Sequence, residues 1–225
     1  MTVTEEFSMG TISAVLFGEC VDSVYLYVHG KNGNKEDAAA FADIAYSKEY
    51  QVLSVDLPNR ADCKPWEAVP ILQEAMCYAR SHWSEVSLYA VSIGAWFSML
   101  AFGDEELKKC LLVSPVLDMK MLIENMMIWA SVSENELERR KLIPTDFGET
   151  LDYEYYQYAK GNPINVWSTP TEILYAENDD LTNIETVEKF TKKFGSGLTV
   201  FENGEHWFHT EEQLAFLRKW ESEHI

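Results

Sequence analysis

The sequence predicts an α/β protein with a mostly parallel sheet flanked by helices. Three observations carry this prediction. The 225 residues are 47% hydrophobic and 13% aromatic, which is enough to fill the core of one medium-sized domain. Most of the short apolar runs are continuous rather than alternating, as expected for strands that helices cover on both faces. Segments with helical patterning separate these runs, so strands and helices alternate along the chain.

Short apolar runs are the candidate strands of this sheet. An early run, Thr11 to Phe17, is expected to pair antiparallel at one edge. Six later runs have the length and continuity of buried strands. They are Val24–Val28, Val52–Val55, Val86–Ala90, Leu111–Val113, Glu172–Ala176 and Leu198–Phe201.

Helix signals fill the intervals between the strands. Asn34, followed by Asp37 three residues later, predicts a helix that continues to Tyr46. Thr210 and Gln213 have the spacing of a capping box, which predicts a last helix at the end of the chain. The apolar stripe of a further helix comprises Val69, Leu72, Met76, Ala79 and Trp83.

One long segment interrupts this alternation. Between Val113 and Glu172 the pattern is helical, is broken at Pro144 and shows no convincing strand. We interpret residues 117–166 as a small helical lid inserted into a single domain that spans residues 1–225. An exposed apolar face on this lid is equally compatible with a dimer contact, so the oligomeric state stays open. The residues at helical spacing are Met119, Leu122, Ile123, Met126, Met127 and Ala130.

The charge balance and the length of the apolar stretches argue against a nucleic-acid-binding protein and a membrane-spanning protein. Eighteen Lys plus Arg against 37 Asp plus Glu give a net charge of −19, which repels nucleic-acid phosphates and anionic lipid. The basic run 139–141 is too short for a nucleic-acid footprint. The longest mostly apolar stretch, Ala90 to Phe102, is too short to span a bilayer. We therefore expect no nucleic-acid partner and no membrane span.

The first ten residues and the cysteines indicate in which cellular compartment the protein is expected. Residues 1–10 include Glu5 and Glu6 and lack a basic start or an apolar run, so they are not expected to be a signal peptide. The four cysteines are scattered, with no CxxC pair and no zinc-type spacing, and are interpreted as buried thiols. We expect a cytoplasmic protein without a metal site.

A candidate nucleophile lies where a predicted strand runs into a helix. The segment 87–96 reads as a buried strand, a sharp turn and a helix, with Ser92 at the turn. A nucleophile on such a turn needs very small residues two positions before and after it, which Ala90 and Gly94 provide. Because the helix starts here, the backbone N–H of Ile93 is placed to stabilise a developing oxyanion.

A serine needs a base to react at neutral pH, and the base needs an orienting acid. Both residue types follow later in the chain, each after a predicted strand. Asp179 and its rival Asp180 follow the run that ends at Ala176, and His206, with His209 as its rival, follows the last run. Sites in parallel sheets form at the carboxyl ends of strands, so these loops are expected to meet.

These motifs together resemble the α/β-hydrolase fold, and the resemblance covers nearly the whole chain. The family places its catalytic residues in the order nucleophile, acid, histidine, which is the order found here. The resemblance implies an α/β-hydrolase fold without a cofactor. The matching motifs are Tyr27-Val28-His29-Gly30, Ala90-Val91-Ser92-Ile93-Gly94, Ala176-Glu177-Asn178-Asp179 and Gly204-Glu205-His206.

The resemblance implies roles for individual residues. Ser92 corresponds to the nucleophile, Asp179 to the acid and His206 to the base. The backbone N–H groups of Lys31 and Ile93 correspond to the oxyanion hole, and His29 shapes the loop beside it. The elbow begins with Ala90 where glycine is usual, and the loop 59–62 lacks the glycines often found there.

The expected function is that of a serine hydrolase acting on a small or medium carboxylic ester. A thioesterase and an amidase or peptidase use the same residues, so these subtypes stay open. A non-catalytic binding protein on the same fold is the alternative from another class. A nucleotide-binding domain has little support, because no glycine-rich phosphate motif follows a strand. The residues expected to line the substrate pocket are Met119, Met126, Met127 and Trp207.

Overall fold

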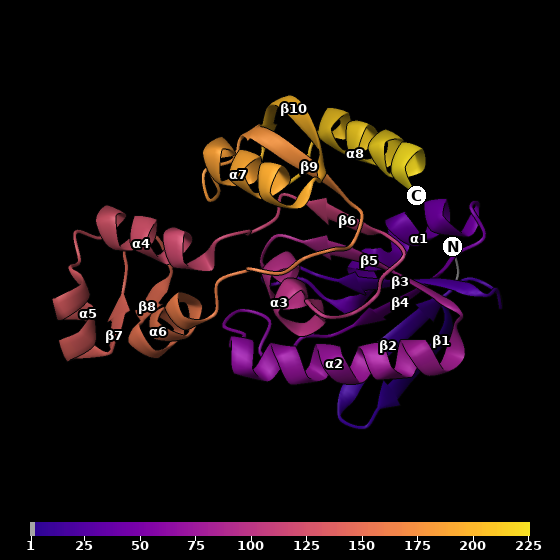
Figure 1. Cartoon of the computed structure of the whole chain (residues 1–225), viewed down its shortest axis with the longest axis horizontal. Coiled ribbons are helices and arrows are strands. Elements are labelled where there is room, and N and C mark those ends of the chain that lie inside the picture. Colours follow the sequence, from indigo (N-terminus) through magenta and orange to yellow (C-terminus); the bar gives the residue numbers. More distant parts are fainter. Residues whose placement is uncertain (1–2) are drawn as a thin grey trace.

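A computed structural model describes residues 3–225 and has an eight-stranded sheet at its centre (Figure 1). The strand order is β1-β2-β4-β3-β5-β6-β9-β10, and every neighbouring pair from β4 to β10 is parallel. This arrangement confirms the predicted fold class. The strands are β1 (Val3–Met9), β2 (Ile12–Phe17), β3 (Ser23–Val28), β4 (Gln51–Val55), β5 (Glu85–Val91), β6 (Cys110–Val113), β9 (Thr171–Asn178) and β10 (Gly197–Glu205).

All six predicted buried runs form strands, and the early run forms β2. β2 pairs antiparallel with β4 as expected, but it does not lie at the edge, because β1 pairs antiparallel with its outer side. Sequence patterning missed β1 because an edge strand needs little burial: Glu5, Glu6 and Ser8 are not buried. This strand occupies most of the stretch judged not to be a signal peptide. Met1 and Thr2 of that stretch lie outside the described residues.

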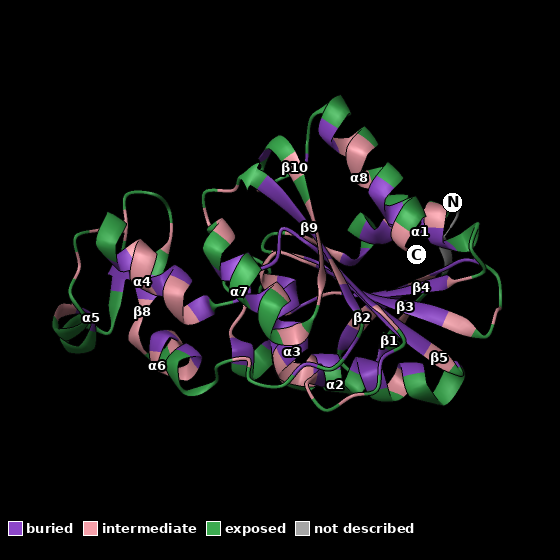
Figure 2. Cartoon of the chain, turned by 45° about the horizontal axis from the view of Figure 1, so that its top comes forward, coloured by how far each residue is buried: buried purple, intermediate pink, exposed green. Residues whose placement is uncertain are grey.

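Two apolar cores, one on each face of the sheet, explain why the central strands are continuously hydrophobic. On β3, Tyr25 and Tyr27 pack against α1 and α8, whereas Val24, Leu26 and Val28 face the core shared with α2 and α3. Figure 2 shows buried strands between helices whose outer sides are exposed. The helices of these layers are α1 (Ala39–Tyr46), α2 (Pro65–His82), α3 (Ile93–Phe102), α7 (Ile184–Phe194) and α8 (Glu211–His224).

The predicted helix starts form as local hydrogen-bonded caps. Asn34 and Asp37 make a reciprocal capping box, although the first turn, Lys35–Ala38, is a 3-10 helix that leads into α1. At the start of α8, the Gln213 N–H donates to Thr210 Oγ1 at 3.2 Å, and the Thr210 N–H donates to Gln213 Oε1 at 3.3 Å. Each box satisfies amides that a helix end leaves without a partner.

Residues 117–166, which we call the α4–α6 segment, extend beyond one end of the sheet (Figure 1). The segment contains helices as predicted, but the expectation of no strand is wrong. Two three-residue strands form an antiparallel pair, and runs this short are not long enough to show a period of two. Its function as a lid stays a prediction. Its elements are α4 (Met119–Trp129), α5 (Glu134–Arg140), β7 (Leu142–Pro144), β8 (Thr150–Asp152) and α6 (Tyr153–Gly161).

The cysteines depart from the expectation of buried thiols. Cys110 is buried, Cys63 is half-buried, and Cys20 and Cys77 are exposed. Cysteine burial depends on which side of a helix or loop the residue occupies, and isolated cysteines give no pattern from which to read it. Among residues 3–225, no helix is long and apolar enough to cross a bilayer.

Candidate active site

Ser92 occupies a strained turn between β5 and α3. Its backbone has φ 51° and ψ −122°, a conformation that side-chain-bearing residues rarely adopt. Hydrogen bonds hold this turn: the Ser92 N–H donates to the carbonyl of Val113 at 3.0 Å, and the Ser92 carbonyl accepts from the amide of Val116 at 3.0 Å. The turn therefore presents the Ser92 side chain beyond the carboxyl end of β5 into a cavity.

Close backbone packing explains the small residues around Ser92. A Cβ added at Gly94 would lie 2.5 Å from the carbonyl oxygen of His29 and 2.8 Å from that of Val28. No ordinary side chain fits at such distances, so glycine is required where α3 passes the end of β3. Ala90, on the other side of the turn, is fully buried between neighbouring strands.

The structure brings the three predicted triad residues together. Ser92 Oγ lies 2.9 Å from His206 Nε2, and His206 Nδ1 lies 2.7 Å from Asp179 Oδ2. The Asp179 side chain is fully buried, and its Oδ1 accepts hydrogen bonds from the amides of Leu181 and Thr182, both at 2.9 Å. These bonds fix the carboxylate, which in turn orients the imidazole toward the serine.

The rival residues occupy other positions. Asp180 is exposed at the cavity wall, whereas the carboxylate that contacts His206 is that of Asp179. The Nδ1–H of His209 donates to the carbonyl of Trp207 at 2.8 Å, and its ring stacks on the indole of that residue. Spacing along the chain separated these pairs only weakly, and the geometry distinguishes them.

The two residues predicted to supply the oxyanion-hole amides lie near Ser92. Ile93 begins α3, and Lys31 follows the Gly30 that packs against the Ser92 side chain. Both residues line the same cavity as Ser92. Neither amide donates to a protein acceptor in the described part of the chain. Their role as an oxyanion hole stays a prediction.

His29 braces the loop that carries Lys31. Its Nδ1–H donates to the carbonyl of Gly30 at 2.7 Å, and its Nε2 accepts from the Leu57 amide at 3.0 Å. Burial lowers the pKa of His29 from its usual value, which favours the neutral ring with its proton on Nδ1. Both ring nitrogens are thus engaged in holding two loops together.

The cavity beside Ser92 has a volume of about 730 Å³ and an apolar wall built largely by α4. Met119 and Met126 line it as predicted. Met127, which is buried in the core, and Trp207, which is 74% exposed, are not among the residues that line it. Helical spacing placed the α4 residues on one face but did not show which part of that face meets the core. Its apolar lining residues include Phe97, Val116, Met119, Leu122, Ile123 and Met126.

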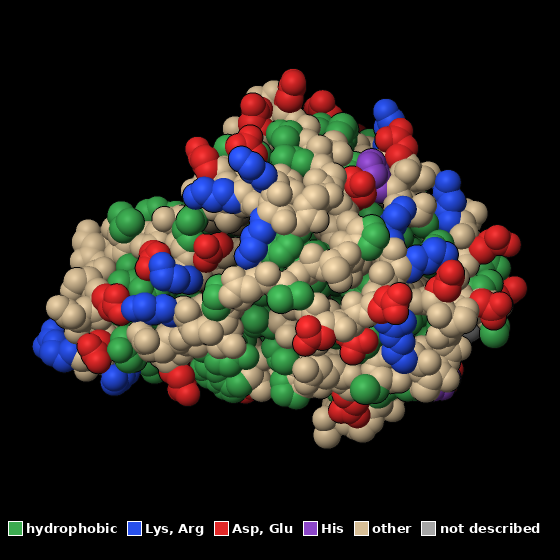
Figure 3. Space-filling view, viewed as in Figure 1, with side chains coloured by type: hydrophobic (Ala, Val, Ile, Leu, Met, Phe, Trp, Pro, Cys, Tyr) green, Lys and Arg blue, Asp and Glu red, His purple; other side chains and the backbone are tan. Residues whose placement is uncertain are grey.

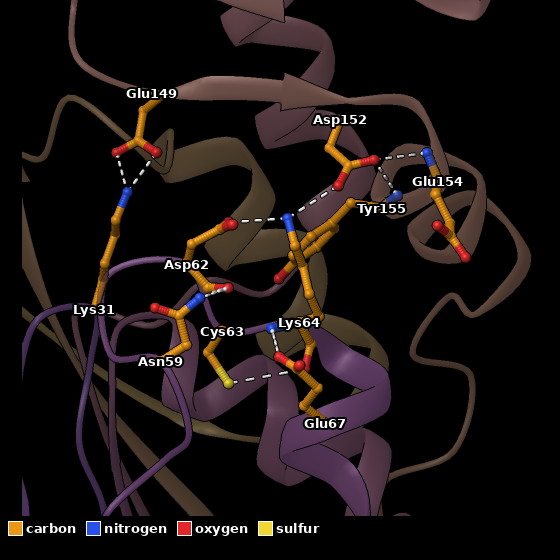
Figure 4. A network of polar contacts seen from close by, with 10 residues as sticks. All are labelled: Lys31, Asn59, Asp62, Cys63, Lys64, Glu67, Glu149, Asp152, Glu154 and Tyr155. Carbon is orange, nitrogen blue, oxygen red and sulfur yellow. Dashed lines mark hydrogen bonds and ion pairs between the residues drawn. The ribbon is translucent and has the colours of Figure 1, made fainter. Parts of the chain in front are cut away.

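Charged residues also line this cavity, and the ion pairs among them, drawn in Figure 4, were not predicted from the sequence. Lys64, from the loop before α2, pairs with Asp62 and with Asp152 of β8, both at 2.9 Å. Lys31 pairs with Glu149, which immediately precedes β8. No local motif marks these pairs, since the partners are separated by 88 and 118 residues in the two long-range contacts. Among residues 3–225, no cluster of metal-ligating side chains is present.

The structure is similar to solved structures over nearly its whole length. Ferulic acid bound to Est1E from Butyrivibrio proteoclasticus gives a TM-score of 0.78 at 16% identity, covering 98% of this chain and 97% of that chain. Alpha/beta hydrolase domain-containing protein 10 from mouse gives 0.73 at 13%, covering 98% and 96%. The esterase domain of a Rhodothermus marinus protein gives 0.67 at 12%, covering 94% and 91%. No protein-family model and no curated protein matches the sequence.

Proposed function

We propose that this chain, which has the α/β-hydrolase fold that its sequence predicted, is a serine hydrolase that cleaves a small or medium carboxylic ester. The hydrogen-bonded chain from Ser92 through His206 to the buried Asp179 is the observation that carries the proposal. A serine, an imidazole and a carboxylate in this order form the minimal arrangement for nucleophilic acyl transfer.

The proposed reaction proceeds in two halves. Ser92 Oγ attacks the ester carbonyl while His206 Nε2 takes the hydroxyl proton, and Asp179 stabilises the imidazolium that results. The amides of Lys31 and Ile93 stabilise the oxyanion of the tetrahedral intermediate. His206 then gives its proton to the departing alcohol, which leaves an acyl-enzyme. A water molecule, deprotonated by His206, attacks that acyl group, releases the acid and restores Ser92.

The cavity supports a substrate with a sizeable apolar part. Its wall of aliphatic, Met and Phe side chains favours a hydrophobic acyl or alcohol group next to Ser92. Methionine side chains adapt to irregular shapes, so Met119 and Met126 suit either an aliphatic or an aromatic group. One of the similar structures holds ferulic acid, so a feruloyl ester belongs among the substrates tested. Ester cleavage is the proposed subtype ahead of thioester or amide cleavage.

The first experiment treats the purified protein with a fluorophosphonate and records its intact mass. We expect one phosphonyl group per chain on the unmutated protein and none on Ser92→Ala. Asp179→Asn and His206→Ala should reduce turnover of an activated ester by roughly ten-thousand-fold, the usual effect of removing a triad member. His209→Ala is the control for His206→Ala and should keep its labelling.

Two outcomes would contradict the proposal. If the unmutated protein takes no label, the fold instead supports a non-catalytic binding protein. If Ser92→Ala still labels, another nucleophile reacts.

When labelling depends on Ser92, the reaction subtype is assigned by comparing matched p-nitrophenyl esters, feruloyl esters, thioesters and anilides. We expect the highest kcat/KM for an ester.

A further inference from the structure

Lys31 links two parts of the molecule that both line the cavity. Its backbone amide lies in the loop beside Ser92, and its side chain reaches across to Glu149 (Figure 4). Glu149 belongs to the turn between β7 and β8 in the α4–α6 segment. One residue thus joins the proposed oxyanion hole to a segment 118 residues further along the chain.

The Glu149 end of this link is held in place within its turn. The Thr145 amide donates to the Glu149 carbonyl at 2.8 Å, and the Thr145 hydroxyl donates to the same oxygen at 2.7 Å. The Glu149 amide in turn donates to Thr145 Oγ1 at 3.2 Å. Three hydrogen bonds therefore fix the backbone from which the carboxylate extends.

The Lys31 end is held by hydrogen bonds on both sides of the residue. The Gly33 amide donates to the Gly30 carbonyl at 3.1 Å, and the Asn32 amide donates to the Arg60 carbonyl at 2.9 Å. Lys31 lies between these bonds, and its own amide has no protein acceptor in the described part of the chain. The Gly30 carbonyl shares its peptide plane with the Lys31 amide and also accepts from His29 Nδ1–H at 2.7 Å. The ion pair with Glu149 adds a further restraint on this loop, made through the Lys31 side chain.

We propose that Glu149 is a positioning residue that acts through the Lys31 side chain to hold the Lys31 amide in the oxyanion hole. This inference rests on the proposed function, because it assigns Glu149 a role only if Ser92 forms a tetrahedral intermediate. The α4–α6 segment then contributes to transition-state stabilisation as well as to the cavity wall. Only interactions that strengthen in the transition state raise kcat, so the effect should appear in kcat more than in KM.

The expected effect is modest because the ion pair is accessible to solvent. The side chains of Lys31 and Glu149 are 36% and 35% exposed, and ion pairs of this kind are weak and screened by salt. We expect Glu149→Gln to lower kcat and the rate of fluorophosphonate labelling about three- to tenfold. Added salt should lower these rates in the unmutated protein toward the values of Glu149→Gln, and should affect the variant little.

A second ion pair provides the discriminating comparison. Lys64 and Asp152 also connect the α4–α6 segment to the rest of the molecule, but neither contributes an amide to the oxyanion hole. Lys64→Gln loosens the segment without releasing Lys31, so it should change KM more than kcat. Lys160→Gln breaks the pair with Glu134 inside the segment, at a similar exposure and away from the cavity, and controls for a general loss of stability.

A double-mutant cycle tests whether Glu149 acts through Lys31. Lys31→Gln keeps the backbone amide, so it should match Glu149→Gln, and the double variant should be no slower than either single one. The exchanged pair Lys31→Glu with Glu149→Lys should regain part of the lost kcat. If Glu149→Gln does not fold, Lys31→Gln measures the same interaction.

Several results would overturn the inference. Additive losses in the cycle would show that Glu149 does not act through Lys31. An equal fall of kcat in Lys64→Gln would show that Glu149 only holds the segment in place. An unchanged labelling rate in Glu149→Gln would refute the role outright. Absence of labelling on the unmutated protein would instead refute the proposed serine hydrolase, so the two failures are distinguishable.

Discussion

Ser92 has a strained backbone conformation, which persists in the folded protein because hydrogen bonds and close packing disfavour other conformations of the turn. The positive φ of Ser92 is held by backbone bonds to Val113 and Val116, which belong to the adjacent strand and the loop after it. The same close packing requires glycine at position 94, two residues after Ser92. Without this glycine, α3 could not approach the end of β3 closely enough to hold Ser92 in its position.

Gly94→Ala is expected to damage both stability and reactivity. Its Cβ would approach the His29 carbonyl to 2.5 Å, so α3 or the end of β3 must shift. We expect a stability loss of about 2 kcal/mol, typical of overpacking, and slower labelling of Ser92. Urea unfolding and intact-mass labelling measure the two effects. Gly161→Ala is the matched control, since a Cβ there meets nothing within 4 Å; equal losses in both variants would refute the packing argument.

Glu221 is a buried carboxyl group in the core between the sheet and α8. Tyr89 donates to it through a hydroxyl 2.6 Å away, and the residue is 3% exposed. Burial raises the pKa of Glu221 to about 7, although the Tyr89 hydrogen bond and Arg218 lower it. The native state thus keeps a proton that the unfolded chain releases at the ordinary glutamate pKa of 4.5.

This proton makes stability fall as pH rises between about 4.5 and 7, because the unfolded state binds fewer protons than the native state in that window. The loss from this group reaches about 3 kcal/mol and levels off above pH 7. Glu221→Gln should remove this component, which urea unfolding across the same pH range would show as a flatter profile than that of the unmutated protein. Parallel profiles would contradict the prediction.

Elements of this chain form where local signals and tertiary burial agree. The capping boxes at Asn34 and Thr210 each set the start of a helix, and the apolar core shared by α1 and α8 stabilises the inner faces of those helices. Strands that lack either a local signal or extensive burial were not predicted from the sequence. β1 has one neighbouring strand and exposed side chains, and the β7–β8 pair depends on the turn bonds between Thr145 and Glu149.

Thr210→Ala is expected to cost about 1 kcal/mol of stability, because it removes the acceptor for the Gln213 amide at the start of α8. Urea unfolding measures this loss. Thr191→Ala is the control: this residue lies inside α7, where alanine is the better helix former, so that variant should be neutral or slightly more stable. A loss as large in the control would show that the cap is not the cause.

The cavity is a property of the whole molecule, because it forms only when the sheet and the α4–α6 segment come together. Ser92 and Phe97 reach it from the β5–α3 region, Met126 from α4, and Leu181 from the loop after β9. The acidic character of the surface also belongs to the molecule as a whole. Figure 3 shows Asp and Glu side chains scattered over the visible face among Lys and Arg. The whole chain has a net charge of −19. We expect this charge to disfavour polyanionic ligands.

Met126→Trp tests whether the acyl group lies against α4. The larger ring would fill part of the cavity, so kcat/KM for long or aromatic acyl esters should fall about tenfold or more while that for an acetyl ester stays nearly constant. Met126→Leu roughly preserves volume and serves as the control. The measurement is kcat/KM across a series of p-nitrophenyl esters; an equal change for every chain length would place the acyl group elsewhere.

Local patterns in the amino-acid sequence predicted the fold class, seven strands of the central sheet and the caps of two helices. Together with the family resemblance, they also indicated Ser92, His206 and the acidic pair that contains Asp179 as candidate site residues. These features depend on hydrophobic periodicity, small residues at a tight turn and the order of motifs along the chain. The folded arrangement was needed to distinguish Asp179 from Asp180 and to exclude Met127 and Trp207 from the cavity. It also brought Lys31 to Glu149, because contacts between distant residues arise from the packing of whole elements and leave no pattern in the local sequence.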